Sequence, residues 1–172
     1  MEMLCDTVCV WALYFRDSVY RKHILKLRSK HRLLIPDICL IEASYPIYKA
    51  KGLKEIEKYS KFVEMMPLSQ NIEIIKIEIE DIARALKIAY NNPQTFIDRE
   101  GNLCLFDAII TSIWYKKNIP LITTDKKLIK LAEKENLTTI KLKQENIETI
   151  INQRQIIYIT NLCNYLIQPP QF

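Results

Sequence analysis

The chain has 172 residues, of which 49% are apolar and 26% charged, with a formal net charge of +5, which is typical of one globular domain with a mild basic excess. No apolar run approaches the ~20 residues of a membrane span, and the N-terminus lacks a signal peptide's basic flank, so we expect a cytoplasmic protein without a membrane partner. Only two glycines occur, Gly52 and Gly101, and they cannot form a G-x-G-x-x-G turn or a P-loop.

Apolar and amphipathic segments alternate along the chain. The expected strands are residues 3–10 (ending near Asp6), 33–35, 72–77, 120–123 and 138–142. The expected helices are residues 18–32, 37–51, 53–66, 80–90, 103–117 and 125–135, with Asp37 as an N-cap and Gly52 as a helix end. This alternation predicts an α/β fold with a parallel sheet covered on both faces. Sites in such sheets form beyond the carboxyl ends of the strands, where the strand order reverses.

Four acidic residues lie at the ends of expected strands or on the inward-facing sides of expected helices: Asp6, Glu42, Asp107 and Asp125. Each follows at least two apolar residues, with Thr123-Thr124 in between in the case of Asp125, and a carboxylate on a buried face is costly unless a cation meets it. The local sequence offers no matching basic partner, so the pattern favours a divalent metal site and chemistry on phosphates. Taken singly, Asp6 and Asp125 are also reasonable helix caps, and Glu42 is compatible with an exposed helix position.

The five cysteines, at positions 5, 9, 39, 104 and 163, contain no C-x-x-C pair. An odd number without that spacing does not indicate a disulfide framework or a zinc site. We therefore expect free, buried thiols.

With these residues in view, the chain resembles a PIN-domain ribonuclease, and most closely the toxin of a prokaryotic type II toxin–antitoxin pair of the VapC type. The resemblance covers residues 3 to about 142. It rests on four motifs in this order: Cys5-Asp6-Thr7 after an apolar strand, Pro36 followed by Glu42, Asp107-Ala108-Ile109-Ile110 opening a later helix, and Ile122-Thr123-Thr124-Asp125.

The resemblance implies a three-layer α/β sandwich in which Asp6, Glu42, Asp107 and Asp125 hold Mg²⁺ or Mn²⁺ and cleave single-stranded RNA. It also implies a small antitoxin partner and a homodimer. Two positions depart from the family pattern. Val8 stands where Asn or Ser is frequent, and Cys104 stands where a small hydroxyl residue is common.

The implied reaction is metal-assisted hydrolysis of the RNA phosphodiester. Four neighbouring carboxylates repel one another, so at least one should have a raised pKa without metal. Thr123 and Thr111 are candidates to orient these carboxylates by hydrogen bonds.

The segment 91–102 is the longest polar stretch inside the core region, and loops of this length are often functional. In a functional loop, Phe96 would stack on a base and Arg99 would contact a phosphate, with Gly101 as a hinge. In a simple connection, Phe96 would pack into the core. Lys126 is a second candidate for an RNA phosphate contact.

Other functions fit parts of the pattern. An aspartyl-nucleophile phosphatase would need a second Asp at the position of Val8. A catalytically inactive RNA-binding PIN protein would not need all four acids. A housekeeping RNA-processing PIN nuclease would look the same, and only a neighbouring antitoxin reading frame would separate it from a toxin.

We expect residues 1–143 to form the nuclease domain and residues 144–172 to form a C-terminal extension. The extension contains many apolar residues, which indicates that it packs on the core or at a dimer contact.

Overall fold

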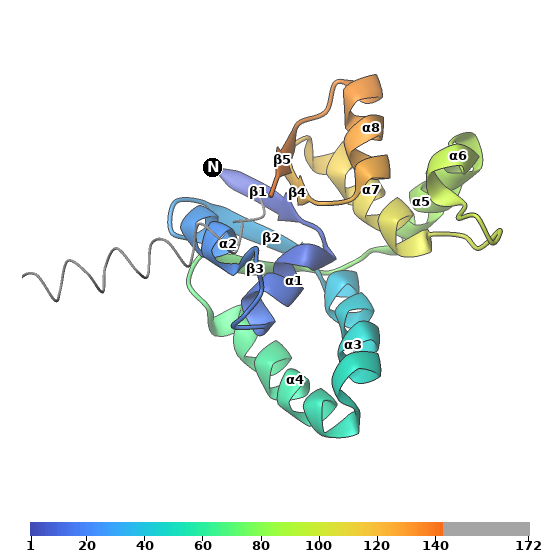
Figure 1. Cartoon of the computed structure of the whole chain (residues 1–172). Coiled ribbons are helices and arrows are strands. Elements are labelled where there is room, and N and C mark those ends of the chain that lie inside the picture. Colours follow the sequence, from blue (N-terminus) through green and yellow to red (C-terminus); the bar gives the residue numbers. More distant parts are fainter. Residues whose placement is uncertain (143–172) are drawn as a thin grey trace, which may run out of the picture. The chain divides into compact units, whose positions relative to one another are not determined.

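A computed structural model describes residues 1–142, and the expected C-terminal extension lies outside the described residues. Five strands alternate with helices in this region (Figure 1). The strands are β1 (Glu2–Cys5), β2 (Arg32–Pro36), β3 (Ile72–Ile75), β4 (Leu121–Thr123) and β5 (Thr139–Lys141). The helices are α1 (Thr7–Tyr14), α2 (Arg21–Arg28), α3 (Asp37–Lys51), α4 (Leu53–Met65), the 3₁₀ turn η1 (Met66–Leu68), α5 (Ile79–Asn91), α6 (Pro93–Phe96), α7 (Leu105–Lys117) and α8 (Lys126–Glu135).

The strands form one parallel sheet in the order β3-β2-β1-β4-β5. The chain builds outward from β1 through β2 to β3 and then returns to the other side of β1 with β4. The strand order therefore reverses between β1 and β4, where Cys5 is in register with Ile122. This is the position at which open α/β sheets bind their ligands.

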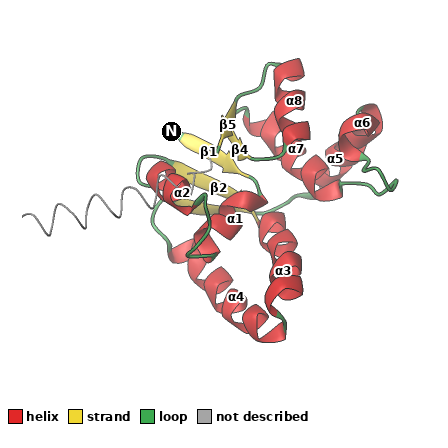
Figure 2. Ribbon diagram, in the orientation of Figure 1, coloured by secondary structure: helices red, strands yellow, loops and turns green. Residues whose placement is uncertain are grey.

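Helices cover the sheet on both faces, which confirms the expected α/β sandwich. Figure 2 shows α1–α4 gathered on one side of the strands and α5–α8 on the other. Right-handed crossovers explain this division, because the chain crosses the sheet in one direction before β3 and in the other after it. None of the helices in residues 1–142 is long and apolar enough to cross a bilayer.

The main difference from the predicted elements lies at the N-terminus. The strand expected over residues 3–10 ends at Cys5, and residues Val8–Val10 belong to α1. Asp6 separates the two elements by capping α1, where its carboxylate accepts a hydrogen bond from the Thr7 N–H. A further correction concerns Asp37, which is the first residue of α3, while Pro36 occupies the cap position.

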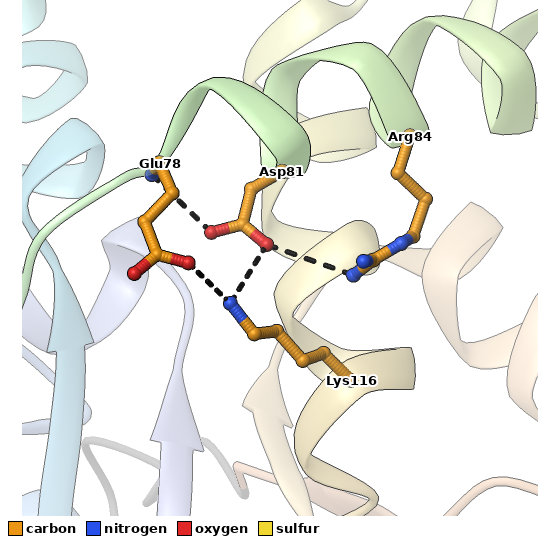
Figure 3. Close-up of polar contacts among 4 residues, drawn as sticks. All are labelled: Glu78, Asp81, Arg84 and Lys116. Carbon is orange, nitrogen blue, oxygen red and sulfur yellow. Dashed lines mark hydrogen bonds and ion pairs between the residues drawn. The ribbon is translucent and has the colours of Figure 1, made fainter.

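A polar cluster joins α5 to α7, the helix that carries Asp107 (Figure 3). Asp81 is only 2% exposed and accepts a hydrogen bond from the Glu78 N–H as part of a capping box. The Lys116 Nζ lies 3.5 Å from Asp81 Oδ1 and 2.6 Å from Glu78 Oε2. Arg84 approaches the same Asp81 oxygen at 3.6 Å. A buried carboxylate with these partners fixes the two helices against each other.

We predict that Asp81→Ala lowers the free energy of unfolding by about 2 kcal/mol, because it removes both the cap and the interhelical contact. Urea unfolding followed by circular dichroism measures the change. Glu57→Ala is the matched control, since it breaks an ion pair whose side chains are 74% and 70% exposed and should cost about 0.5 kcal/mol or less. Equal losses in the two variants would contradict this role for Asp81.

Candidate active site

The four acidic residues singled out in the sequence line one cavity of about 540 Å³. Each comes from a different part of the fold: Asp6 follows β1, Glu42 lies on α3, Asp107 lies in the first turn of α7, and Asp125 caps α8 after β4. Because β1 and β4 are parallel neighbours, their carboxyl ends bring Asp6 and Asp125 to the same edge of the sheet. The cavity therefore lies at the reversal of strand order.

Asp6 is held at both carboxylate oxygens. Its Oδ1 accepts from the Thr7 N–H at 2.6 Å, and its Oδ2 accepts from the Thr123 hydroxyl at 2.6 Å. The side chain is 8% exposed, and burial raises the pKa of Asp6 from 3.8 to about 6, although both hydrogen bonds oppose the rise. Asp6 is thus a positioned carboxylate whose charge is poorly solvated.

Glu42 and Asp125 are also fixed by nearby groups. The Thr7 hydroxyl donates to Glu42 Oε2, which links α1 to α3, and burial raises the pKa of Glu42 above its ordinary value. Asp125 Oδ1 accepts from the Lys127 and Leu128 N–H groups at 2.5 and 3.0 Å, so this residue is a helix cap and a cavity residue at once.

Asp107 has the most perturbed carboxyl group of the four. Burial is the largest cause that raises its pKa from 3.8 to about 7. The negative charges of the other three acids raise the pKa further, and the charge of Lys127 lowers it. The expectation that mutual repulsion raises at least one pKa is borne out in direction, although burial contributes more to the rise than the neighbouring charges do.

As they stand, the side chains in residues 1–142 include no group of three or more His, Cys, Asp or Glu placed to hold a metal ion. The chemistry of the donors nevertheless fits Mg²⁺ or Mn²⁺, which prefer carboxylate oxygens and keep several waters. A divalent cation in the cavity would also relieve the repulsion that raises the pKa of Asp107. The residues that would hold it are Asp6, Glu42, Asp107 and Asp125.

The other predicted residues are divided between the cavity and the rest of the fold. Lys126 lines the cavity, whereas Thr123 does not line it and donates a hydrogen bond from its hydroxyl to Asp6. The Thr111 hydroxyl, in contrast, donates to the main-chain carbonyl of Asp107 at 2.7 Å and not to its carboxylate. Arg99 is exposed and does not line the cavity.

The segment 91–102 is more structured than the sequence suggested. It contains the short helix α6, and Phe96 is fully buried, so this ring packs in the core and is not available for a base. Asp98 organises the turn by accepting hydrogen bonds from the N–H groups of Glu100 and Asn102 at 2.9 and 2.8 Å. Gly101 follows with a φ of 85°, which favours glycine.

Several residues that line the cavity have no role predicted from the sequence: Thr7, Val8, Trp11 and Thr124. Thr7 belongs to one of the four sequence motifs without a predicted role of its own, yet it contacts two of the four acids. Lys126 and Lys127 directly follow Asp125 and supply positive charge beside the carboxylates, so the expectation that the local sequence offers no matching basic partner is wrong. The four cysteines within the described residues are free, as expected, and three of them are buried.

A family model described as "PIN domain" matches residues 3–134 of the chain. Because the match covers most of the sequence, this chain belongs to the PIN domain family. No curated protein matches it.

Several solved structures share the fold. VapBC2 from Rickettsia felis, bound to a promoter DNA fragment, has 21% identity and a TM-score of 0.57, with 83% of this chain and 100% of that chain covered. VapC20 from Mycobacterium tuberculosis, described as a sarcin-ricin loop cleaving toxin, has 14% identity and a TM-score of 0.56, with 75% and 94% covered. FitAcB from Neisseria gonorrhoeae has 11% identity and a TM-score of 0.55, with 80% and 96% covered.

The raised pKa of Asp107 predicts how the stability of the metal-free protein depends on pH. The folded state binds a proton at Asp107 more tightly than the unfolded chain, so this contribution is full below pH 3.8 and is lost as pH rises towards 7. Asp107→Asn should remove that loss and make the protein more stable than wild type near pH 7.5, by on the order of 2 kcal/mol. Urea unfolding in EDTA across this pH range measures it, and parallel pH profiles for the two proteins would refute the assignment.

Proposed function

We propose that this PIN domain protein is an endoribonuclease that depends on Mg²⁺ or Mn²⁺ and cleaves single-stranded or loop RNA. The observation that carries the proposal is the convergence of Asp6, Glu42, Asp107 and Asp125 on one cavity at the reversal of strand order. A divalent ion bound there would activate a water and stabilise the charge that develops on the phosphate.

The chain's own groups prepare the site for this chemistry. The hydroxyls of Thr123 and Thr7 and the Thr7 N–H hold Asp6 and Glu42 in fixed orientations, which lowers the cost of assembling the ligands. Lys126 and Lys127 are exposed at the cavity wall beside Asp125, where a cationic side chain can contact an RNA phosphate. Arg99, outside the cavity, is a more distant candidate for the same kind of contact.

We further propose that the protein is the toxin of a toxin–antitoxin pair and acts in the cytoplasm. Support comes from fold neighbours whose descriptions name VapBC assemblies, and from one described as a toxin–antitoxin complex from Klebsiella pneumoniae. A housekeeping RNA-processing nuclease would have the same site, and an antitoxin reading frame beside the gene distinguishes the two. A catalytically inactive RNA-binding protein would bind RNA without cleaving it.

We predict that Asp6→Asn and Asp107→Asn each reduce RNA cleavage by at least about 100-fold, because each removes a carboxylate proposed to bind the metal. Cleavage of unstructured and hairpin RNAs is followed with Mg²⁺, with Mn²⁺ and with EDTA. Glu57→Gln, a change at an exposed carboxylate on α4, should cleave like wild type. Wild-type rates in either Asp variant, or full activity in EDTA, would show that the proposed metal site is wrong.

An apolar face on α5 and the adjoining turn supports a homodimer. The α5 apolar face is formed by Ile79, Ile82, Leu86, Tyr90, Ile97 and Leu103, all at least 39% exposed. Ile79 and Tyr90 are 81% and 85% exposed. Contiguous apolar side chains of this kind usually mark an interaction site, and we propose a second copy of the chain as the partner.

Leu86→Glu should shift the full-length protein from dimer to monomer, because it places a charge in the centre of the proposed contact. Size-exclusion chromatography with light scattering gives the mass over a range of protein concentrations. Leu53→Glu, at a 76% exposed position on α4, should leave the mass unchanged. If wild type is monomeric, or if Leu86→Glu remains a dimer, the face is not the dimer contact.

A further inference from the structure

A second cavity adjoins the acidic cavity along α1. Its volume is about 530 Å³, and it shares Val8, Trp11 and Thr124 with the cavity that the four acids line. We call it the indole groove, formed by Val8, Trp11, Phe15, Val19, Pro46 and Ile47. Because the two cavities have walls in common, one ligand of modest size can occupy both.

The two cavities differ in chemistry. The acidic cavity has Lys126 and Lys127 in its wall, whereas none of the described residues that line the indole groove is basic. The groove is lined mostly by aromatic and aliphatic side chains from α1, α3 and the segment between α1 and α2, and its polar residues are Asp17, Ser18 and Thr124. A phosphate therefore has cations only on the acidic side, and the groove suits a flat, uncharged group.

Trp11 lies in the wall that the two cavities share. Its indole Nε1 is buried and has no hydrogen-bond partner among the described residues. The other tryptophan, Trp114, is fully buried and donates its Nε1–H to the Ile119 carbonyl at 2.8 Å. Proteins pair nearly all buried donors of this kind, so Trp11 differs from Trp114 in that its indole N–H has no partner within the described part of the chain.

We propose that the indole groove binds one nucleobase of the RNA, from a nucleotide next to the phosphate at the four carboxylates. This inference rests on the proposed nuclease function and extends it to the substrate. A base and its phosphate are joined by a single sugar, which matches an apolar groove that shares a wall with an ion-binding cavity. The base stacks against the aromatic side chains of Trp11 and Phe15, an arrangement that holds single-stranded nucleic acids in other proteins. The consequence is a base preference at one position beside the cleavage site.

The test uses the full-length Asp107→Asn protein, so that RNA binds without being cleaved. A short single-stranded RNA carries one abasic nucleotide at each position in turn, and its affinity is measured with Mg²⁺ present. One position should lose about tenfold in affinity without its base. Iodouridine at that position should form a photo-crosslink to Trp11 or Phe15, identified by mass spectrometry.

Ala50 allows the groove to be filled without changing its aromatic wall, because this residue is exposed in the last turn of α3 and lines the groove. In the Asp107→Asn background, Ala50→Trp should remove the position-dependent loss by excluding the base, while Ala50→Ser should retain it. Circular dichroism spectra of both proteins verify that they are folded.

The proposal is overturned if every abasic position binds alike, or if crosslinks form only outside the groove. It is also overturned if Ala50→Trp leaves the base dependence intact, or if this variant loses only the binding of an antitoxin polypeptide. Cleavage by the wild-type protein is scored separately. If the wild-type protein cleaves RNA but the affinity is the same at every abasic position, the nuclease function stands and the base site is wrong. If the affinity depends on one base but no cleavage occurs, the base site stands and the nuclease function is wrong.

Discussion

Four carboxylates that share one partly buried cavity oppose the folding of the region around them, because burial disfavours their charged forms and their mutual repulsion adds to this cost. Water solvates the charges poorly where Asp6 is 8% exposed, so burial and neighbouring charge together raise the pKa of Asp6 and of Asp107 to about 6 and about 7. Carboxyl groups in this condition either hold protons or meet a cation. A divalent ion would satisfy the second alternative.

The fold determines where the acids meet, and short polar contacts determine how they are held. Parallel pairing of β1 with β4 brings two chain segments more than a hundred residues apart to one edge of the sheet. Thr123 crosses from β4 to Asp6, and Thr7 reaches from α1 to Glu42 on α3. The cluster of Asp81 and Lys116 fixes α7, which presents Asp107 from the opposite group of helices. Two of the four acids therefore lie on helices, and the other two each cap a helix just after a strand.

Much of this arrangement could be predicted from the sequence, because the apolar runs follow from the needs of a buried parallel sheet and the four acids interrupt apolar segments where a charge is costly. The apolar run Val8–Val10 suggests a strand although it is helical, because a short buried helix and a buried strand have the same apolar composition, and α1 is buried on most of its sides. The Thr111 hydroxyl donates to the Asp107 carbonyl of its own helix, a bond that Thr side chains in helices often make. The contact of Thr7 with Glu42 joins residues 35 apart, and the burial of Phe96 depends on packing, so no local pattern reveals either.

Calorimetric titration of Mn²⁺ at pH 6, in buffers of different ionisation enthalpy, shows whether the four carboxylates bind one shared divalent cation. With pKa values of about 7 and about 6, Asp107 is mostly protonated and Asp6 is about half protonated at this pH in the metal-free protein, and metal binding requires both to be deprotonated. Between about one and two protons should be released per bound ion, and Asp107→Asn should release fewer protons and bind Mn²⁺ more weakly. Binding heats that do not depend on the buffer, or no Mn²⁺ binding, would contradict a shared cation site at the four carboxylates.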